Sequence, residues 1–298
     1  MSNNAKYSLL LILQSLFWGV GNPVMKIAMF TMPPLWCLFF RFALACLIFA
    51  VVFRRKLKQQ YAPRHMKGCL LVGVSFAAAY IFAAFSLRLT MATISGFLMG
   101  LAVMFVPFIA WPLFRRPPRP AAFLAIAVTA VGMYLLCGGG DFSFGWGELL
   151  AIASSFCSAL MFTTTERYVN EVGPELLSVV QTGVTALIVL VLALAMEKLD
   201  LPAVNLTSWL SILYMALMAT CVACFIQNHA LGCVRALTAS FIYCLEPVFS
   251  AVASFFLLDE RTGLLGLIGA ALIIAGIMLA NVLGAAEDRR PSVETQAR

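Results

Sequence analysis

The sequence has few charged residues: 11% of its 298 residues are Asp, Glu, Lys or Arg, whereas 62% are hydrophobic. Soluble domains carry about 25% charged and about 45–50% apolar residues, so this chain has too little polar surface to cover a water-soluble globule. Its mean hydropathy of +0.97 is likewise that of a strongly apolar chain. The composition excludes soluble, nucleic-acid-binding and disulfide-scaffold classes and predicts an integral membrane protein.

Motifs of nucleotide and metal chemistry are also absent from the sequence. It has no GxxxxGK[ST] phosphate loop, no HExxH and no paired Cys/His ligand set. The nine cysteines lie almost wholly in apolar runs, and the CxxC at Cys221 and Cys224 has no second pair, which favours packing. We therefore expect no cofactor, no metal and no nucleic-acid partner, and we expect that the chain is not an enzyme.

Long apolar runs, separated by short polar or Gly/Pro segments, predict transmembrane helices. A helix needs about 20 mostly apolar residues to cross the hydrocarbon core, and the apolar share suffices for about nine or ten spans. The pattern predicts ten spans, near 7–29, 34–53, 68–88, 92–114, 120–137, 147–167, 175–196, 208–228, 236–258 and 264–284.

The distribution of Lys and Arg predicts the orientation of these spans. With the N-terminus inside, fifteen of the twenty Lys and Arg residues lie at cytoplasmic ends, four lie at outer ends, and Arg41 lies within a span. Cytoplasmic loops carry an excess of Lys and Arg, so we expect a multi-pass cell-membrane protein with both termini cytoplasmic. The residues 287–298 are polar, and we expect a disordered cytoplasmic tail there.

The two halves of the sequence resemble each other. The segment 92–101 aligns with 236–245, and the same offset places Gly132 on Gly276. Five spans are an odd number, so a second copy must enter the membrane from the opposite side. The loop after the fourth span is basic and its counterpart after the ninth is largely acidic, which agrees with a reversed second copy.

These features predict an all-α integral membrane protein of ten transmembrane helices in two inverted five-helix repeats. The first repeat comprises 1–140 and the second comprises 141–286. Near the start of each repeat, Pro33 aligns with Pro174 at a slightly shorter offset. Inverted repeats are typical of secondary transporters, which bind their substrates near the midplane between the repeats.

Three sets of residues add a family resemblance: Trp18-Gly19 with Gly21-Asn22-Pro23 and Lys26; Pro34 with Arg41-Phe42; and Cys244-Leu245-Glu246-Pro247-Val248-Phe249 with Leu258-Asp259-Glu260, Gly269 and Gly276. They resemble the EamA-type family of the drug/metabolite transporter superfamily. The resemblance covers residues 7–284. It implies ten helices in two inverted repeats, alternating access, transport usually without ATP, and export as the commoner direction.

Two ionisable side chains lie deep within the predicted spans, where each costs at least about 2.5–3.5 kcal/mol. Glu246 is expected near the midplane, and the following Pro247 removes a backbone donor and favours a kink. Glu246 either carries a proton or binds a cationic group, or it bonds freed backbone groups or pairs with Arg41. Arg41 either attracts a carboxylate or phosphate or anchors carbonyls between helices.

The expected substrate site begins in the first helix. Gly19, Gly21 and Pro23 predict a local break in that helix, which is tolerated at membrane depth where it lines a cavity. Trp18 and Asn22 are four residues apart and share one helix face. Other spans contribute Arg41 and Glu246, with the alternatives given above, and further candidates for each of which packing is the alternative: Tyr80, Phe97, Met99, Phe162, Thr163, Gln181, Gln227 and Tyr243.

We therefore predict a secondary transporter, an exporter in direction, of small organic metabolites such as amino acids or drug-like solutes. A small-molecule substrate and the lipid bilayer are the expected partners, and proton coupling through Glu246 is one option. The alternatives are an intramembrane enzyme acting on a lipid-linked substrate and a passive facilitator or channel. The sequence carries no signal of the oligomeric state.

Overall fold

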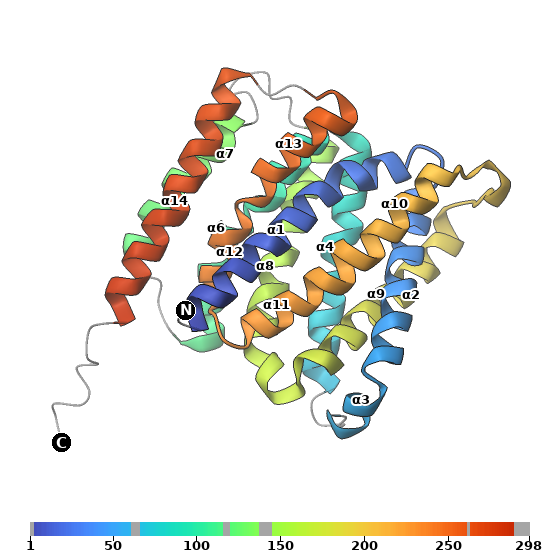
Figure 1. Ribbon diagram of the computed structural model, residues 1–298, viewed down its shortest axis with the longest axis horizontal. Helices are drawn as coiled ribbons and strands as arrows, with labels where there is room; N and C mark the ends of the chain where they lie inside the picture. The colour runs from blue at the N-terminus through green and yellow to red at the C-terminus, as the bar shows by residue number, and fades with distance from the viewer. Residues whose placement is uncertain (1–2, 61–65, 116–119, 137–144, 261–262, 289–298) are drawn as a thin grey trace.

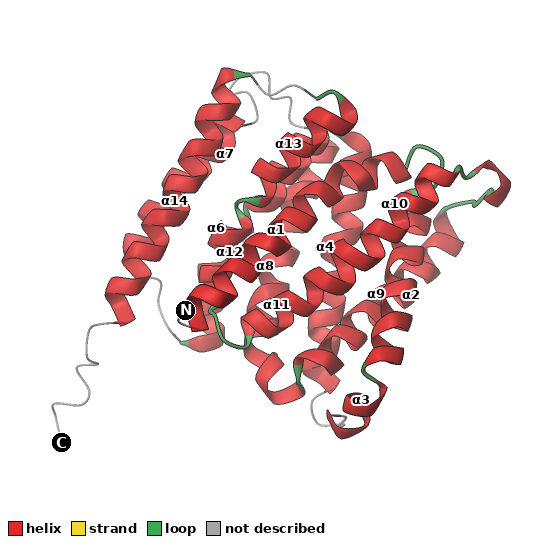
Figure 2. Ribbon diagram, viewed as in Figure 1, coloured by secondary structure: helices red, strands yellow, loops and turns green. Residues whose placement is uncertain are grey.

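A computed structural model describes residues 3–60, 66–115, 120–136, 145–260 and 263–288. Within these residues every regular element is helical (Figure 2). The elements are α1 (Asn3–Ala28), α2 (Pro34–Val52), α3 (Arg54–Gln60), α4 (Met66–Leu89), α5 (Ala92–Gly100), α6 (Ala102–Phe114), α7 (Pro120–Leu136), α8 (Trp146–Val172), α9 (Pro174–Met196), a 3-10 turn (Leu201–Ala203), α10 (Leu206–Ala216), a π-helical segment (Leu217–Val222), α11 (Ala223–Leu231), α12 (Ala236–Tyr243), α13 (Glu246–Leu258) and α14 (Leu264–Asp288).

Eight helical stretches of the described chain are long and apolar enough to cross a membrane. In three of them consecutive elements act as one span: α5 with α6, α10 through α11, and α12 with α13. The other two predicted spans correspond to α7 and α14, whose apolar stretches, Phe123–Leu135 and Leu264–Gly276, are shorter. The chain is therefore a helical, multi-pass membrane protein, and the count of ten spans stays a prediction.

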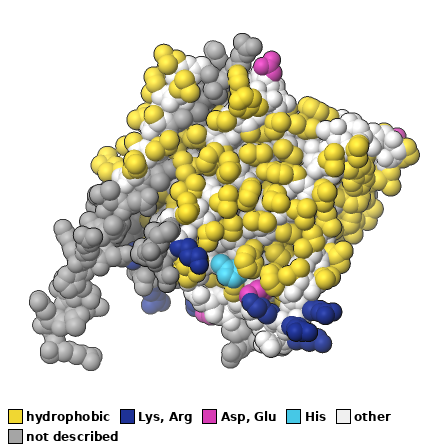
Figure 3. Space-filling view, in the orientation of Figure 1, with side chains coloured by type: hydrophobic (Ala, Val, Ile, Leu, Met, Phe, Trp, Pro, Cys, Tyr) yellow, Lys and Arg dark blue, Asp and Glu magenta, His cyan; other side chains and the backbone are white. Residues whose placement is uncertain are grey.

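The outer surface of the helices is strongly apolar. Large side chains such as Phe256, Leu194 and Leu187 are 77%, 68% and 64% exposed. Figure 3 shows a broad band of hydrophobic side chains across the molecule, with Lys and Arg gathered along its lower margin. Monomeric soluble proteins rarely expose contiguous apolar patches larger than a few hundred Å², so this band is suited to lipid rather than water.

The ends of several helices form two groups, each held together by glutamate side chains. One group, which we call the Glu260 end, contains the end of α1 and the starts of α2 and α5, held together around Glu260 and Glu197. The other, the Glu175 end, contains α3, the start of α9 and the end of α11, held around Glu175. In Figure 1 the Glu175 end lies at the lower margin, where α3 is labelled.

Packing joins the two halves of the sequence along most of the bundle. Helix α1 packs on α13, α2 packs on α9, and α4 packs on α8. At one side of the bundle α7 and α14, the fifth and last helices of the predicted repeats, pack on each other (Figure 1). A bundle core built from both halves positions any site between them.

The sequence repeat corresponds to repeated local structure. Leu101 separates α5 from α6, and Leu245, its counterpart in the second repeat, stands at the break between α12 and α13. Each second segment then ends on a left-handed residue, Arg115 with φ of 54° and Asp259 with φ of 55°, which are again equivalent positions of the two repeats. These are the positive-φ non-glycine residues of the described chain. The fourth helix of each half therefore has the same interruption and the same end.

The predicted break in the first helix is wrong. Helix α1 is continuous from Asn3 to Ala28, with Pro23 inside it. Gly19 instead permits close packing, because a Cβ at this position would lie 2.5 Å from the Cβ of Phe249 and 2.7 Å from the carbonyl oxygen of Glu246. The glycine thus brings α1 against the start of α13.

The C-terminal boundary also differs from the expectation. Helix α14 continues to Asp288, so residues 287 and 288 belong to the helix rather than to the predicted tail. The rest of that tail, 289–298, lies outside the described residues, as does Cys137.

We expect Gly19→Ala to destabilise the protein by about 1–3 kcal/mol, the usual cost of overpacking, because the new methyl group meets backbone atoms of α13. Thermal unfolding in detergent measures this. Gly21→Ala is the matched control, since its Cβ would lie 3.4 Å from the Cβ of Ala219, an ordinary contact. Equal unfolding temperatures for the two variants would contradict the close approach of α1 and α13.

Candidate functional site

A cavity of about 80 Å³ lies between the two halves of the bundle. Its walls come from α1, α2, α4, α5 and α6 of the first half and from α8, α10, α12, α13 and the π-helical segment of the second. Eight of the twelve predicted site residues line it: Trp18, Asn22, Arg41, Tyr80, Met99, Phe162, Tyr243 and Glu246. The structure thus gathers residues from near the start and near the end of the sequence.

Three rings form one wall of the cavity, which we call the aromatic floor: Trp18, Phe162 and Tyr243. The ring centroids are 4.7 Å apart for Phe162 and Tyr243, 5.3 Å for Trp18 and Tyr243, and 6.3 Å for Trp18 and Phe162. Such pairs stabilise each other beyond their area of contact. Because the rings come from α1, α8 and α12, the aromatic floor ties the two halves together.

Arg41 is 3% exposed and holds a position between helices. Its Nε donates to Thr220 Oγ1 at 2.7 Å and its Nη2 donates to the Ala219 carbonyl oxygen at 3.1 Å. The guanidinium carbon lies 4.6 Å from the ring centroid of Tyr80 and 4.9 Å from that of Phe42, within cation–π range. These two bonds use two of the five guanidinium donors, so the side chain both anchors a carbonyl and lines the cavity.

The Ala219 carbonyl belongs to the π-helical segment. A π-helix bonds i to i+5 and occurs mostly as short bulges, frequently at functional sites. The Ala219 carbonyl oxygen also accepts from Trp18 Nε1 at 3.0 Å, so Trp18 and Arg41 share one acceptor. One backbone atom therefore fixes an aromatic and a cationic side chain of the cavity.

Glu246 lies at the first position of α13, directly after the break in the span, and Pro247 follows it within the first turn. This agrees with the interruption predicted at Pro247. Asn22 Nδ2 donates to Glu246 Oε1 at 3.2 Å, and no ion pair joins Glu246 to Arg41 among the described residues. The start of a helix favours a carboxylate, so the hypothesised pair with Arg41 is replaced by an amide and a helix terminus.

Four predicted site residues lie outside the cavity. Phe97, 6% exposed, packs in a separate cluster with Phe241 and Ile273, although Met99, two residues on, lines the cavity. The hydroxyl of Thr163 donates to the Ala159 carbonyl oxygen at 2.7 Å. Gln181 and Gln227 are completely buried between helices beyond the aromatic floor.

The sequence reasoning missed Gln14, which lies directly behind the aromatic floor. Gln14 Nε2 donates to Gln227 Oε1 at 3.2 Å, and Tyr243 Oη donates to Gln14 Oε1 at 3.2 Å. Gln227 Nε2 in turn lies 3.1 Å from the sulfur of Met161. A signal was present, because Gln14 is an amide within a predicted span, four residues before Trp18 and on the same helix face.

At the Glu260 end, one carboxylate joins three segments. Glu260 accepts from the backbone amides of Ala92 and Thr93 at 3.2 Å each and from Thr93 Oγ1 at 2.8 Å, which caps the start of α5. Lys26 Nζ lies 3.3 Å from Glu260 Oε1 and donates to the Thr90 carbonyl oxygen at 3.1 Å. Lys26 is therefore paired within the protein.

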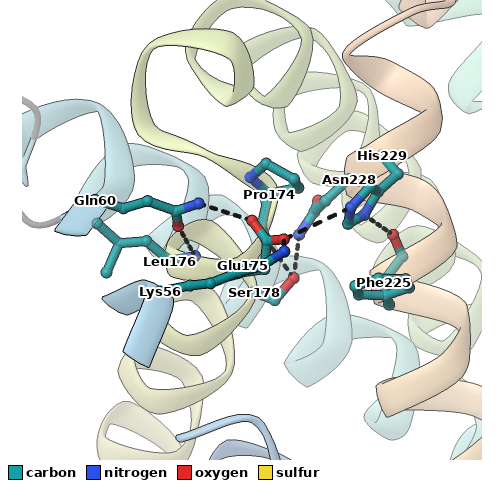
Figure 4. A network of polar contacts seen from close by, with 9 residues as sticks. All are labelled: Lys56, Gln60, Pro174, Glu175, Leu176, Ser178, Phe225, Asn228 and His229. Atoms are coloured by element: carbon teal, nitrogen blue, oxygen red, sulfur yellow. Dashed lines mark hydrogen bonds and ion pairs between the residues drawn. The ribbon is translucent and has the colours of Figure 1, made fainter. Parts of the chain in front are cut away.

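At the Glu175 end, a second network joins α3, α9 and α11 (Figure 4). Glu175 accepts from Gln60 Nε2 at 2.8 Å and pairs with Lys56, while His229 Nε2 lies 3.9 Å from it. Gln60 Oε1 accepts from the backbone amide of Leu176 at 3.1 Å and caps the start of α9. We call the group of Lys56, Gln60 and Glu175 the Glu175 latch.

Among the described residues, no group of three or more His, Cys, Asp or Glu side chains is placed to hold a metal ion. The described cysteines are free thiols, and Cys221 and Cys224 are buried among the packed helices. In the cavity, a ligand can therefore contact the aromatic floor, the amide of Asn22 and the charged groups of Arg41 and Glu246.

Comparison with known proteins identifies the family. The family model described as the EamA-like transporter family matches the chain twice, over residues 5–138 and 145–282. The chain belongs to the EamA-like transporter family. The resemblance seen in the sequence motifs is thereby confirmed, as is the duplication, since each half matches the model once.

Two relatives from Archaeoglobus fulgidus are both named "Uncharacterized transporter". One is 26% identical over 272 residues, which cover 91% of this chain and 84% of the relative. The other is 25% identical over 285 residues, covering 93% and 97%. A solved crystal structure of 17% identity superposes with a TM-score of 0.76 over 94% of this chain and 97% of that one, and this likeness shows the fold. Family and relatives indicate a transporter, which is consistent with the expectation that the chain is not an enzyme.

We expect acidification to weaken the Glu260 end. Burial raises the pKa of Glu260, but hydrogen bonds from Thr93 and Ala92 and the charge of Lys26 outweigh it and hold the pKa below its usual value. The stabilisation by Glu260 is therefore present above the ordinary glutamate pKa of about 4.3 and is lost as the pH falls through the lower folded-state value.

Thermal unfolding as a function of pH checks this prediction. Glu260→Gln should be less stable at neutral pH, and its stability should change less than that of the wild type as the solution is acidified. The control is Glu171→Gln. Glu171 pairs with Arg167, and because the side chains of Glu171 and Arg167 are 40% and 44% exposed, this ion pair contributes little to stability. A wild-type pH profile in Glu260→Gln would show that the carboxylate contributes nothing.

Proposed function

We propose that the protein is a secondary transporter that moves small organic solutes by alternating access between two inverted repeats. The observation that carries the proposal is the cavity, because both halves build it and its walls contain Arg41, Glu246 and the aromatic floor. A site between repeats is where secondary transporters bind their substrates.

Reciprocal capping of α2 and α9, the second helices of the two halves, supports the inversion. The backbone amide of Leu35, near the start of α2, donates to Glu197 Oε2 at 2.9 Å, just beyond the end of α9. The amide of Leu176, near the start of α9, donates to Gln60 Oε1 at 3.1 Å, beyond the end of α2. Each helix starts where the other ends, as inversion of the second repeat requires.

The chemistry of the cavity suits solutes that combine an apolar or planar body with a polar group, such as amino acids or drug-like compounds. Rings tolerate many planar and apolar ligands, whereas Arg41 can bind a carboxylate and Glu246 can accept a hydrogen bond or a positive charge. The Lys and Arg residues along the Glu175 end support a cell-membrane protein whose Glu175 end and termini face the cytoplasm. Export is the direction that the family resemblance favours.

Transport into proteoliposomes tests the proposal. We expect saturable uptake and counterflow for at least one member of a panel of amino acids and drug-like compounds, because alternating access binds one solute at a time. Flux that does not saturate and shows no counterflow would identify a passive channel instead.

Substitution of cavity residues should weaken solute binding. We expect Trp18→Leu and Arg41→Lys to raise the KM by about tenfold, equivalent to about 1.4 kcal/mol, because each removes a contact within the cavity. Phe97→Leu is the matched control, since Phe97 is buried outside the cavity. Unfolding temperatures establish that the variants are folded, and an unchanged KM in folded Trp18→Leu and Arg41→Lys would contradict binding at this site.

Glu246→Gln separates proton coupling from a structural role of the carboxylate. If Glu246 carries the coupled proton, the variant should lose the stimulation of uptake by an imposed proton gradient and keep counterflow, which needs no net proton movement. Glu171→Gln, outside the cavity, should retain the stimulation. Wild-type pH dependence in a folded Glu246→Gln protein would assign the residue to structure alone.

A further inference from the structure

Beyond the aromatic floor, the bundle contains a set of buried amides that the cavity does not include. Gln181 on α9 and Gln227 and Asn228 on α11 are each 0% exposed. Helix α11 packs on both α8 and α9 in this region. We call these three residues the polar seam.

The polar seam is incompletely bonded. Within the described part of the chain, neither amide atom of Gln181 has a nitrogen or oxygen partner, and the thiol of Cys224 beside it is only a weak one. Among the same residues, Asn228 Oδ1 has no hydrogen-bond partner either. Most buried polar atoms in proteins are bonded, and a buried amide without a partner costs about 1–3 kcal/mol on mutational scales. A packed structural interface between membrane helices would be more stable with apolar residues at these positions. The amides therefore indicate a role other than packing.

The seam extends from the aromatic floor to the Glu175 latch. At one extremity Gln227 accepts from Gln14, whose own carbonyl accepts from Tyr243 of the floor. At the other, Asn228 Nδ2 donates to Ser178 Oγ at 2.8 Å, and Ser178 is one helical turn from Glu175 on α9. Gln181 lies one further turn along the same face of α9, beside the thiol of Cys224. Polar groups on α9 and α11 therefore recur from the aromatic floor to the Glu175 latch, in a part of the bundle that the cavity does not include.

Both extremities of this course are closed by contacts between separate helices. The aromatic floor brings together α1, α8 and α12. The Glu175 latch holds α3 against α9, and His229 of α11 stands beside it (Figure 4). Lys56 has a side chain that is 57% exposed, whereas that of Glu175 is 5% exposed, so the latch lies where the seam meets the solvent-facing margin.

We propose that the polar seam is the second half of the solute's path, closed in this structure and opened when the Glu175 latch separates. The proposal rests on the proposed transport function and names the residues that the solute meets after it leaves the cavity. Water and the polar groups of the solute then bond the free amide atoms of Gln181 and Asn228. Because amides donate and accept without a net charge, the seam passes solutes with carboxylate, ammonium or hydroxyl groups.

Replacement of Gln181 by an apolar residue of similar length tests the seam. We expect Gln181→Met to lower the turnover of transport by about tenfold, because the moving solute and its water lose their amide partner, while the unfolding temperature rises. The affinity for solute added from the Glu260 end should stay at the wild-type value. Ser254→Ala is the matched control: Ser254 is buried on α13 with an unpartnered hydroxyl, so its removal should raise stability and leave transport unchanged.

Labelling shows whether the seam opens. Gln181→Cys in oriented proteoliposomes should react with a membrane-impermeant thiol reagent applied from the Glu175 end and be spared by reagent from the Glu260 end. Peptide mass spectrometry distinguishes position 181 from the native cysteines. Adding Lys56→Ala should raise the labelling rate by about threefold, a modest effect because a partly exposed ion pair contributes little. Adding Lys58→Ala, on the same helix outside the latch, should not.

The outcomes separate the seam from the proposed function. If the wild type transports a solute but Gln181→Met transports at the wild-type rate, or position 181 reacts only from the Glu260 end or from neither end, the seam is not part of the path while the transport function stands. A wild type with no saturable transport of any solute would overturn the two together.

Discussion

The close approach of α1 to α13 at Gly19 is the contact on which the rest of the cavity depends. It places Trp18 one residue before the contact and Asn22 one helical turn beyond it. From there Trp18 reaches the rings of Phe162 and Tyr243, and Asn22 reaches Glu246. A single missing side chain thus determines how far apart two helices lie, and with them the rings and the carboxylate that a ligand would meet.

Lipid offers no hydrogen bonds to exposed backbone groups, so each helix start and interruption needs a partner within the protein. The chain meets this need with side chains from other segments, which in three of the following four cases belong to the other half. Glu260 caps α5 and Glu197 caps α2, while Gln60 caps α9 and Glu166 accepts from the amide of Ala236 at the start of α12 at 2.6 Å. Because every one of these caps belongs to a different segment from the helix it serves, movement of one segment relative to another must exchange hydrogen bonds at the ends of the bundle.

Much of this architecture could be predicted from hydropathy and the internal repeat. Those signals predicted the eight long apolar helices and the duplication, since apolar length and a fixed offset are properties of the chain itself. Of the twelve predicted site residues, eight line the cavity. The rotation of each helix about its axis is set by its neighbours, and the sequence pattern does not determine it. Phe97 and Met99 share a short helix but face different surroundings. For Arg41 the sequence left two roles open, and in the structure it bonds a carbonyl between helices, that of Ala219, rather than Glu246. The same limit hid Gln14, whose role depends on Gln227 in the other half of the sequence.

The π-helical segment has a consequence for how this family of sequences can vary in length. A π turn accommodates one residue more than an α turn, so deleting one residue within Leu217–Val222 would restore a regular α-helix. Because the wide turn takes up the extra residue, such a deletion would leave Gln227 and Asn228 on the same side of the helix, with α11 still packed on α8 and α9. Deletion of one residue from a regular α-helical part of this span would instead rotate everything C-terminal to it by about 100°, the angle of one residue in an α-helix. Changes of length are therefore tolerated best at the turn whose Ala219 carbonyl accepts from Trp18 and Arg41.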